Sequence, residues 1–149
     1  MKKILLKIIT PEKLIFEEMV DQVSIPTTLG EITVLPDHIP LITEITSGDI
    51  VAFEKGEQIP MTVVGGFLEV KKDENNITNV AVLADFAEHI SELNDEVIEK
   101  AKARADELRE QMQNKEHVDY EHFATELERS LTRIKIADKW KTKKYRSHS

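Results

Sequence analysis

Residues 63–70, VVGGFLEV, decide how the first half of this chain folds. Two strand-like runs, 59–64 and 67–71, meet at the glycine pair, and glycine allows the positive φ angles that the tightest hairpin turns require. After the glycines, apolar and charged residues alternate, so Leu68 and Val70 share one face of the second run. Because that face must be covered, the stretch predicts a β-hairpin packed against a second sheet.

Further short runs rich in valine and isoleucine surround this stretch, with turn residues between them. These runs cover residues 3–10, 14–16, 20–25, 31–35, 41–45, 49–54 and 77–84. About eight to ten short strands at such close spacing are typical of an all-β sandwich or a flattened barrel. We therefore expect the N-terminal part of the chain to be a β-sandwich.

The distribution of glycine and proline divides the chain. All five glycines and all five prolines lie at or before Gly66, and residues 67–149 contain neither. Both residue types mark turns and are excluded from helix interiors. From about residue 94 the apolar residues recur every three or four positions, which is the helical period. The pattern predicts an α+β chain in two parts, a β-sandwich over residues 1–88 and a helical part over residues 89–149.

The helical part is expected to be an antiparallel hairpin of two amphipathic helices. The apolar stripe of the first helix is Val97, Ala101, Ala105, Leu108 and Met112, and that of the second is Tyr120, Phe123, Leu127, Leu131 and Ile134. Asn94 suits the N-cap of the first helix, residues 114–118 form the break, and Asp119 can cap the second helix. A pair this short buries little, so we expect it to dock only marginally on the sandwich.

The charge of the chain is unevenly distributed. Residues 1–87 carry 7 Lys and Arg against 14 Asp and Glu, and residues 88–128 carry 5 against 13, whereas residues 129–149 carry 8 against 1. A nucleic-acid-binding protein needs a broad basic face, which this acidic body does not offer, so we expect no nucleic-acid partner. The basic end requires an acidic partner surface, within this protein or on another.

The C-terminal residues 138–146 interleave Trp140 and Tyr145 with basic residues. Such a segment can stack on nucleic acid, remain a disordered end, or dock on an acidic protein surface. Since the acidic body repels nucleic acid, we favour docking on an acidic protein surface, with disorder in the isolated protein as the next alternative.

The residues that most often carry catalysis or bind metals are missing or scattered. The chain has no cysteine, and its five histidines (38, 89, 117, 122 and 148) do not form a metal-binding spacing, since His117 and His122 are five positions apart. The glycine pair is not followed by the Lys-Ser/Thr of a phosphate-binding loop. We therefore expect a protein that is not an enzyme and that binds no metal or cofactor.

Two further features concern exposure. His38 lies between two prolines, and it is either a loop histidine that hydrogen-bonds to its own turn or a rigid projection that docks on a partner. The N-terminal apolar run breaks into polar residues by Lys7 and is too short for a signal peptide, and no run approaches membrane-spanning length. We expect a soluble, intracellular protein.

Six blocks of residues resemble, in order and spacing, the epsilon subunit of the bacterial F-type ATP synthase over nearly the whole chain. The blocks are residues 9–13 (ITPEK, with Phe16 following), 25–31 (IP, then GE), 35–41 (LPDHIPL), 65–70 (GGFLEV), 82–88 (VLADFAE) and 131–137 (LTRIKIA). The resemblance implies a ten-stranded β-sandwich that binds the gamma subunit and the c-ring on the cytoplasmic face of the bacterial membrane, peripherally and without chemistry of its own. It also implies a helical hairpin that is permissive when folded on the sandwich and inhibits ATP hydrolysis when extended into the alpha/beta catalytic head.

The resemblance assigns residues to these contacts by position. It implies a c-ring contact at Glu31 and a gamma-subunit interface at Thr10, His38, Thr43 and Val64. It implies that Arg129, Arg133, Lys135 and Lys139 face acidic residues of the catalytic beta subunit when the hairpin is extended.

This sequence departs from the family pattern in two places. Thr27 and Thr33 stand where the family usually has glycine, so we expect a different local turn near the c-ring contact. Some members bind ATP through a motif Ile/Leu-Asp-x-x-Arg-Ala, and here Asn94 replaces the Asp and Val97 replaces the Arg. The loss of this cation predicts weak or no ATP binding.

Two other functions remain open on the residues alone. One is a stand-alone β-sandwich adaptor or binding protein with a helical dimerisation arm, which requires an apolar pocket with a few polar groups. The other is an assembly chaperone whose hairpin binds a partner helix. Native mass spectrometry of a pull-down separates these functions, because only the stalk subunit requires the gamma subunit in near-stoichiometric amounts.

Overall fold

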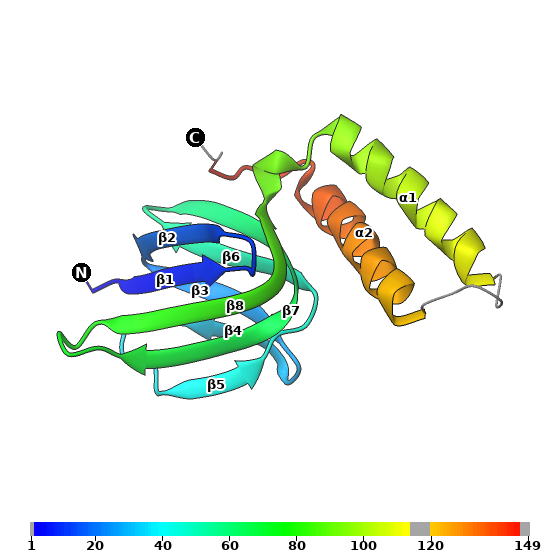
Figure 1. Ribbon diagram of the computed structural model, residues 1–149. Helices are drawn as coiled ribbons and strands as arrows, with labels where there is room; N and C mark the ends of the chain where they lie inside the picture. The colour runs from blue at the N-terminus through cyan, green and yellow to red at the C-terminus, as the bar shows by residue number, and fades with distance from the viewer. Residues whose placement is uncertain (1, 114–119, 147–149) are drawn as a thin grey trace.

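The computed structural model describes residues 2–113 and 120–146, and it has a strand-rich part followed by two helices (Figure 1). The strands are β1 Ile4–Ile9, β2 Leu14–Val20, β3 Gln22–Thr27, β4 Gly30–Val34, β5 Leu41–Glu44, β6 Gly48–Glu54, β7 Glu57–Lys72 and β8 Thr78–His89. A short 3-10 helix, η1 (Ile90–Glu92), leads to α1 (Asp95–Gln113) and α2 (Tyr120–Trp140). No helix among the described residues is long and apolar enough to cross a membrane.

The strands form one continuous hydrogen-bonded sheet that folds over itself into a sandwich (Figure 1). Its order is β2-β1-β8-β7-β6-β3-β4, and β5 pairs with β7. The first half of β7 pairs with β6, the second half pairs with β5, and β8 runs beside both halves. The two long strands therefore belong to both layers, and the β1–β8 pair is parallel while the other pairs are antiparallel.

The expected hairpin at the glycine pair is wrong, because β7 continues through it. Gly65 and Gly66 have the expected positive φ angles of 66° and 125°, but they lie where β7 exchanges its neighbour β6 for β5. A Cβ on Gly66 would lie 2.2 Å from the carbonyl oxygen of Leu83 and 2.8 Å from the Cα of Ala84. The glycines therefore allow β8 to approach closely where β7 passes between the layers.

The expected number of ten strands is not confirmed, since the described residues form eight. The runs 59–64 and 67–71 are one strand of 16 residues, and the run expected to end at Ala84 extends to His89. The glycine pair led to the prediction of two strands, 59–64 and 67–71, because glycine usually marks a turn. Here the glycines lie inside one strand, at the point where it passes from one layer to the other.

One apolar cluster fills the sandwich. Alternate residues of β1 are fully buried, and so are Leu68 and Val70, as the alternation predicted. The cluster contains Ile4, Leu6, Ile8, Phe16, Val20, Val23, Ile25, Val34, Ile45, Ile50, Ala52, Ile59, Met61, Val63, Leu68, Val70, Val80, Val82, Ala84 and Ala87. Burial of each large aliphatic side chain contributes about 1.5–3 kcal/mol. Because no residue of the cluster comes from α1 or α2, the core of the sandwich does not depend on the helices.

The helices follow their expected stripes only in part. Ala101, Ala105 and Leu108 of α1 are buried, and the amide of Val97 donates to Asn94 Oδ1 at 2.9 Å, which confirms the N-cap. In α2, however, Tyr120 and Leu131 are 47% and 37% exposed, while Thr132, Ile136 and Trp140 are buried. The second helix has two packed faces, and its stripe toward the sandwich was missed. The expected break at 114–118, the Asp119 cap, His117 and His148 lie outside the described residues.

Candidate functional site

The outer face of β6, β7 and β8 carries two buried carboxylates. Asp49 pairs in register with Thr62, and Thr62 with Glu88, so the three side chains form one row across three strands. The side chains of Asp49 and Glu88 are only 10% and 9% exposed. A buried carboxylate requires a cation or several hydrogen-bond donors, and α2 supplies both.

The C-terminal half of α2 pairs with these carboxylates. Arg133 donates from Nε and Nη2 to the two oxygens of Glu88 at 2.7 and 3.1 Å, which is a bidentate contact. Asp49 accepts a hydrogen bond of 2.8 Å from the indole Nε1 of Trp140, and the Lys139 ammonium lies 2.8 Å from the same carboxylate. Burial raises the pKa of the Glu88 carboxyl, and the hydrogen bonds from Arg133 act in the opposite direction.

Phe86 is the second support for α2. The guanidinium of Arg129 lies 4.4 Å from the ring centroid of Phe86, and that of Arg133 lies at 5.7 Å. Both cations therefore face the electron-rich side of one ring. The Nε of Arg129 is buried and has no hydrogen-bond partner among the described residues.

A small apolar cluster completes this docking face. It consists of Val51, Ile90, Ile136 and Trp140, with Phe53, Leu93 and Tyr145 packed against it. A few apolar side chains and ion pairs therefore hold the helix on the sandwich. This apolar cluster is much smaller than the one that fills the sandwich.

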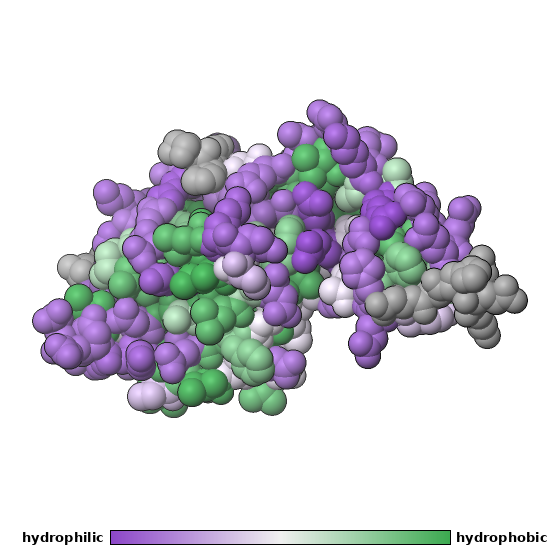
Figure 2. Space-filling model, viewed as in Figure 1, coloured by the Kyte–Doolittle hydropathy of each residue, from purple (hydrophilic) through white to green (hydrophobic). Residues whose placement is uncertain are grey.

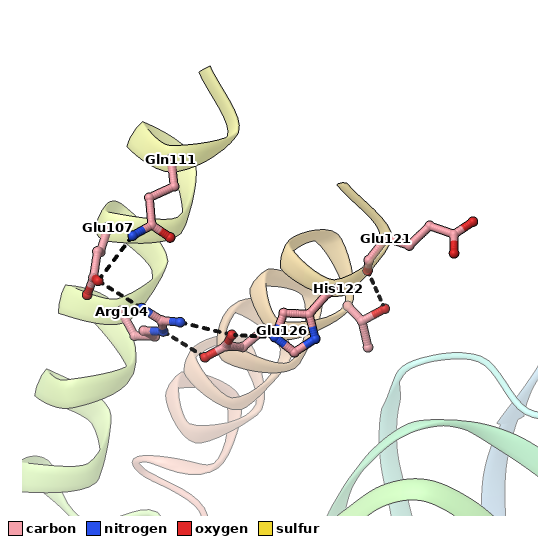
Figure 3. Close-up of polar contacts among 7 residues, drawn as sticks. Arg104, Glu107, Gln111, Glu121, His122 and Glu126 are labelled. Atoms are coloured by element: carbon pink, nitrogen blue, oxygen red, sulfur yellow. Dashed lines mark hydrogen bonds and ion pairs between the residues drawn. The ribbon is translucent and has the colours of Figure 1, made fainter. Parts of the chain in front are cut away.

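Helix α1 is attached to α2 by an ion-pair group (Figure 3). Arg104 donates to both oxygens of Glu126 at 2.6 and 3.0 Å, and its Nη1 lies 2.9 Å from Glu107 on its own helix. His122 Nε2 lies 3.8 Å from Glu126. The hydrogen bonds with Arg104 lower the pKa of Glu126, and those with Glu126 and Glu107 raise the pKa of Arg104.

A second surface lies on the opposite layer and is uncovered. Leu14, Ile9, Leu83 and Phe67 are successive register partners across β2, β1, β8 and β7. Leu83 and Phe67 are each 58% exposed, and Ile42 on the neighbouring β5 is 71% exposed. Figure 2 shows apolar side chains gathered on this face of the sandwich. We call these five residues the apolar row, and this exposed apolar surface is a candidate protein-binding site.

Glu31 is the second residue of β4, close to the turn between β3 and β4. Leu29, beside it, is 87% exposed, and Glu31 is exposed. Thr27 Oγ1 donates to the carbonyl of Gly30 at 2.6 Å and accepts from the amide of Leu29 at 3.2 Å. The threonine side chain therefore links the residues of this turn, and whether the turn differs from that of the family stays a prediction. Thr33 forms a hydrogen bond of 3.0 Å with Ser24 on the paired strand.

The structure does not bring the four residues assigned to a gamma interface together. Thr10 follows Ile9, the second residue of the apolar row, but it is buried, and its hydroxyl donates to the carbonyl of Lys13. Thr43 is half-buried beside Ile42 at the other end. Val64 is buried opposite Phe86 on the helix-docking face. His38 is half-buried, with Nδ1 2.7 Å from the carbonyl oxygen of Ile39, which supports the loop-histidine alternative.

Of the four basic residues assigned to the beta-subunit contact, Arg129, Arg133 and Lys139 contact the sandwich, while Lys135 is exposed. Sequence reasoning missed their partners Asp49, Phe86 and Glu88. It also left Trp140 in the tail, although its spacing of four from Ile136 extends the helix. Two basic residues of the predicted tail contact carboxylates of the chain itself, since Lys139 pairs with Asp49 and Arg146 pairs with Glu18.

A cavity of about 540 Å³ opens between the start of α1 and the end of α2. Its charged lining is balanced, with three lysines and three acidic residues: Lys102, Lys135, Lys141, Asp95, Glu99 and Asp138. Apolar side chains such as Leu93, Ile98 and Ile134 complete the wall. Among the residues that the structure describes, no group of three His, Cys, Asp or Glu could hold a metal ion.

Known proteins resemble this chain along most of its length. The family model for the beta-sandwich domain of the ATP synthase delta/epsilon chain matches residues 3–90. The ATP synthase epsilon chain of Desulforamulus reducens is 34% identical over 134 residues, which cover 89% of this chain and 96% of the relative. That of Halalkalibacterium halodurans is 37% identical over 131 residues, which cover 87% and 93%.

A chain in the cryo-EM structure of the Euglena gracilis mitochondrial ATP synthase, described as OSCP/F1/c-ring, shares the fold. Its TM-score is 0.66 at 20% identity, with 93% of this chain and 82% of that chain covered. The beta-sandwich model matches the chain from the first strand to the last, and relatives above 30% identity cover 87–89% of it, so this chain belongs to the family of ATP synthase epsilon chains.

Proposed function

We propose that this chain is a central-stalk subunit of an F-type ATP synthase that couples the gamma subunit to the c-ring and restrains ATP hydrolysis through its helical hairpin. It does no chemistry itself, and it associates peripherally with the cytoplasmic face of the bacterial membrane through the complex. One contrast carries the proposal: the sandwich has its own large core, whereas α2 is held by four buried residues and a few ion pairs. The proposed function requires a rigid domain, which the sandwich supplies, and a segment that can dissociate from it, which the helical hairpin supplies.

The apolar row is the proposed contact with the gamma subunit. Four of its five residues are exposed, the buried Thr10 follows its fifth residue, Ile9, and Thr43 follows Ile42. We keep His38 as a contact in the adjoining loop. Val64 is covered beside Phe86 when the hairpin is docked, so we propose that it reaches the gamma subunit only after α2 leaves. The Euglena gracilis assembly that contains the structural relative includes F1 and the c-ring, which supports these partners.

Glu31 is the proposed contact with the c-ring. It lies on the protruding β3–β4 hairpin next to Leu29, and Thr27 holds the turn that presents both side chains. A contact with the rotor has to transmit torque, which requires a rigid turn. The hydrogen bonds of Thr27 make this turn rigid and so favour the assignment.

The hairpin is proposed to exchange one acidic partner for another. In the docked state Arg133 and Lys139 neutralise Glu88 and Asp49, and Arg129 covers Phe86. With Lys135 they form the surface that would face acidic residues of the catalytic beta subunit in the extended state. Because the carboxylates left behind become exposed to water again, release costs less than breaking a permanently buried pair.

The test is the ATPase activity of the assembled complex with and without residues 89–149. We expect faster hydrolysis without them, while the gamma subunit and c-ring remain bound. An unchanged rate would remove the restraining role and leave the coupling role in place. Native mass spectrometry of a pull-down then decides the coupling role, because an absence of the gamma subunit would contradict it.

ATP binding by the isolated chain is expected to be weak or absent. Val97 offers no cation at the start of α1, and the nearby cavity carries equal numbers of lysines and acidic residues. A polyanion therefore gains little there. Isothermal titration calorimetry checks this expectation, and saturable micromolar binding would contradict it.

The stand-alone adaptor with a dimerisation arm has less support. Ala101, Ala105 and Leu108, the small apolar stripe that would pair with a second copy, are already buried within the chain. The cavity between the helices has a mixed charged lining rather than the apolar wall that the adaptor requires.

A further inference from the structure

The chain beyond α2 turns back over the sandwich instead of pointing away from it (Figure 1). The amide of Lys143 donates to the carbonyl of Trp140 at 3.2 Å, which reverses the direction of the backbone. Tyr145 then meets Trp140 edge-on, with ring centroids 6.2 Å apart, and the Lys143 ammonium lies 5.3 Å from the indole. Trp140 is thus covered from the solvent side by residues that follow it.

Arg146 attaches this segment at two points. Its amide donates to the carbonyl of Gln58 at 2.8 Å, and its guanidinium pairs with the carboxylate of Glu18 on β2. Gln58 precedes Met61, where the pairing of β7 with β8 begins, so β8 offers no partner for its carbonyl. The two anchors lie on strands from different parts of the sheet order, β2 and β7.

We propose that residues 141–146 form a strap that holds the C-terminal end of α2 on the sandwich. The strap covers Trp140, which itself fills the docking cluster and donates to Asp49. Only five residues separate Trp140 from Arg146, so each contact keeps the other at high effective concentration. Release of the strap exposes Trp140 and weakens the docking of α2.

This inference deepens the proposed function, since a strap regulates the hairpin that restrains hydrolysis. Its test nevertheless uses the full-length isolated chain, where no other subunit is present. A failure of the strap therefore leaves the ATPase experiment unaffected, and a failure of the ATPase experiment leaves the strap unaffected.

The chain contains a single tryptophan, Trp140, so its fluorescence reports on the strap directly. The variant Arg146→Glu places two like charges together at Glu18. We expect acrylamide quenching of Trp140 to rise about two- to threefold, and hydrogen exchange of the last α2 amides to accelerate roughly three- to tenfold. Exchange in the β1 and β8 amides stays unchanged, which shows that the sandwich remains folded.

Two further variants make the result specific. Lys144→Glu applies the same change of charge to an exposed residue of the strap, and we expect no effect on either measurement. The exchange of charges in Glu18→Arg with Arg146→Glu restores the parent values. Equal effects of Arg146→Glu and Lys144→Glu, or no recovery in the exchanged pair, would overturn the proposal.

The backbone anchor is tested separately. Arg146→Ala keeps the amide that donates to Gln58, whereas Arg146→Pro removes it. We expect the proline variant to expose Trp140 more than the alanine variant does. If the two variants are quenched equally, the hydrogen bond to Gln58 contributes nothing to the strap.

Discussion

Glu88 shows what a single residue can require of a distant segment. Its carboxylate is buried on the sheet, and the cation that compensates it, Arg133, comes from a helix 45 residues later in the chain. Neither residue is exceptional in the sequence, because acidic and basic residues are common at exposed positions. Burial alone makes this pair important, and burial depends on the packing of α2.

The first prediction concerns this pair. Arg133→Met retains the apolar stem beside Phe86 but leaves Glu88 without its bidentate partner, which should weaken docking of α2 by about 2–3 kcal/mol. Hydrogen exchange of the buried α2 amides measures the change. Lys135→Met removes the same charge from an exposed position of the same helix and should change docking by less than about 0.5 kcal/mol. Addition of Glu88→Gln to Arg133→Met should recover part of the loss, and an absence of recovery would show that the pair is not the cause.

A second prediction concerns Asp37, where two strands and the N-terminus meet. Hydrogen bonds from Lys2, the larger cause, and from Lys72 lower the pKa of this carboxyl from 3.8 to about 2. A lowered pKa in the folded state means that the contribution to stability is complete above pH 3.8 and is lost as the pH falls through about 2. A titration of the Asp37 carboxyl carbon by NMR should show this low midpoint, and Lys2→Gln should raise it. A midpoint that stays at the ordinary value would contradict the contact.

At the scale of elements, the glycine pair marks the limit of prediction from sequence. Residues 63–70 correctly indicated positive φ angles and the buried positions of Leu68 and Val70. They did not distinguish a turn from a strand that changes partner, because both require the same backbone freedom. Only the positions of β5, β6 and β8, which come from elsewhere in the chain, decide between the two.

The third prediction follows from this crossing. Gly66→Ala places a methyl group 2.2 Å from the backbone oxygen of Leu83 at a φ of +125°, so the sandwich should lose at least about 3 kcal/mol or fail to fold. Gly56→Ala is the matched control, since it also has a positive φ but nothing within 4 Å, and it should cost about 1 kcal/mol. Urea unfolding of the two variants compares them. Equal losses would show that the close approach of β8 does not matter.

The helices repeat the same lesson about prediction. Sequence period correctly gave the stripe of α1, which has one packed face, and it missed Thr132 and Ile136 in α2, which has two. A helix between a sheet and another helix buries residues on both sides, and a single-stripe template cannot represent it. The contacts of the basic tail were easier to predict than the packing of α2, because the acidic body and the basic end of the chain already indicated that the tail binds acidic groups.

At the scale of the whole molecule, the two parts differ in what they need from each other. The sandwich encloses twenty buried apolar residues without any from the helices. The helices bury their residues against one another and against one patch on β6, β7, β8 and η1. We therefore expect stability to be shared unequally, so that the helices open at a lower free-energy cost than the sandwich unfolds.

The last prediction tests this inequality by division of the chain after Glu92, where η1 ends. Residues 1–92 should unfold cooperatively in urea, because their core is intact, although Val51, Phe53 and Phe86 lose the cover of α2. Residues 93–149 alone should show much less helix by circular dichroism than the full chain, since isolated helices of this length are marginal in water. When the two fragments are mixed, the helix content measured by circular dichroism should rise only in the fraction of molecules in which the helices dock on the sandwich. An unfolded first fragment, or a second fragment with full helix content, would contradict the unequal division and with it the idea of a stiff mount that carries a releasable hairpin.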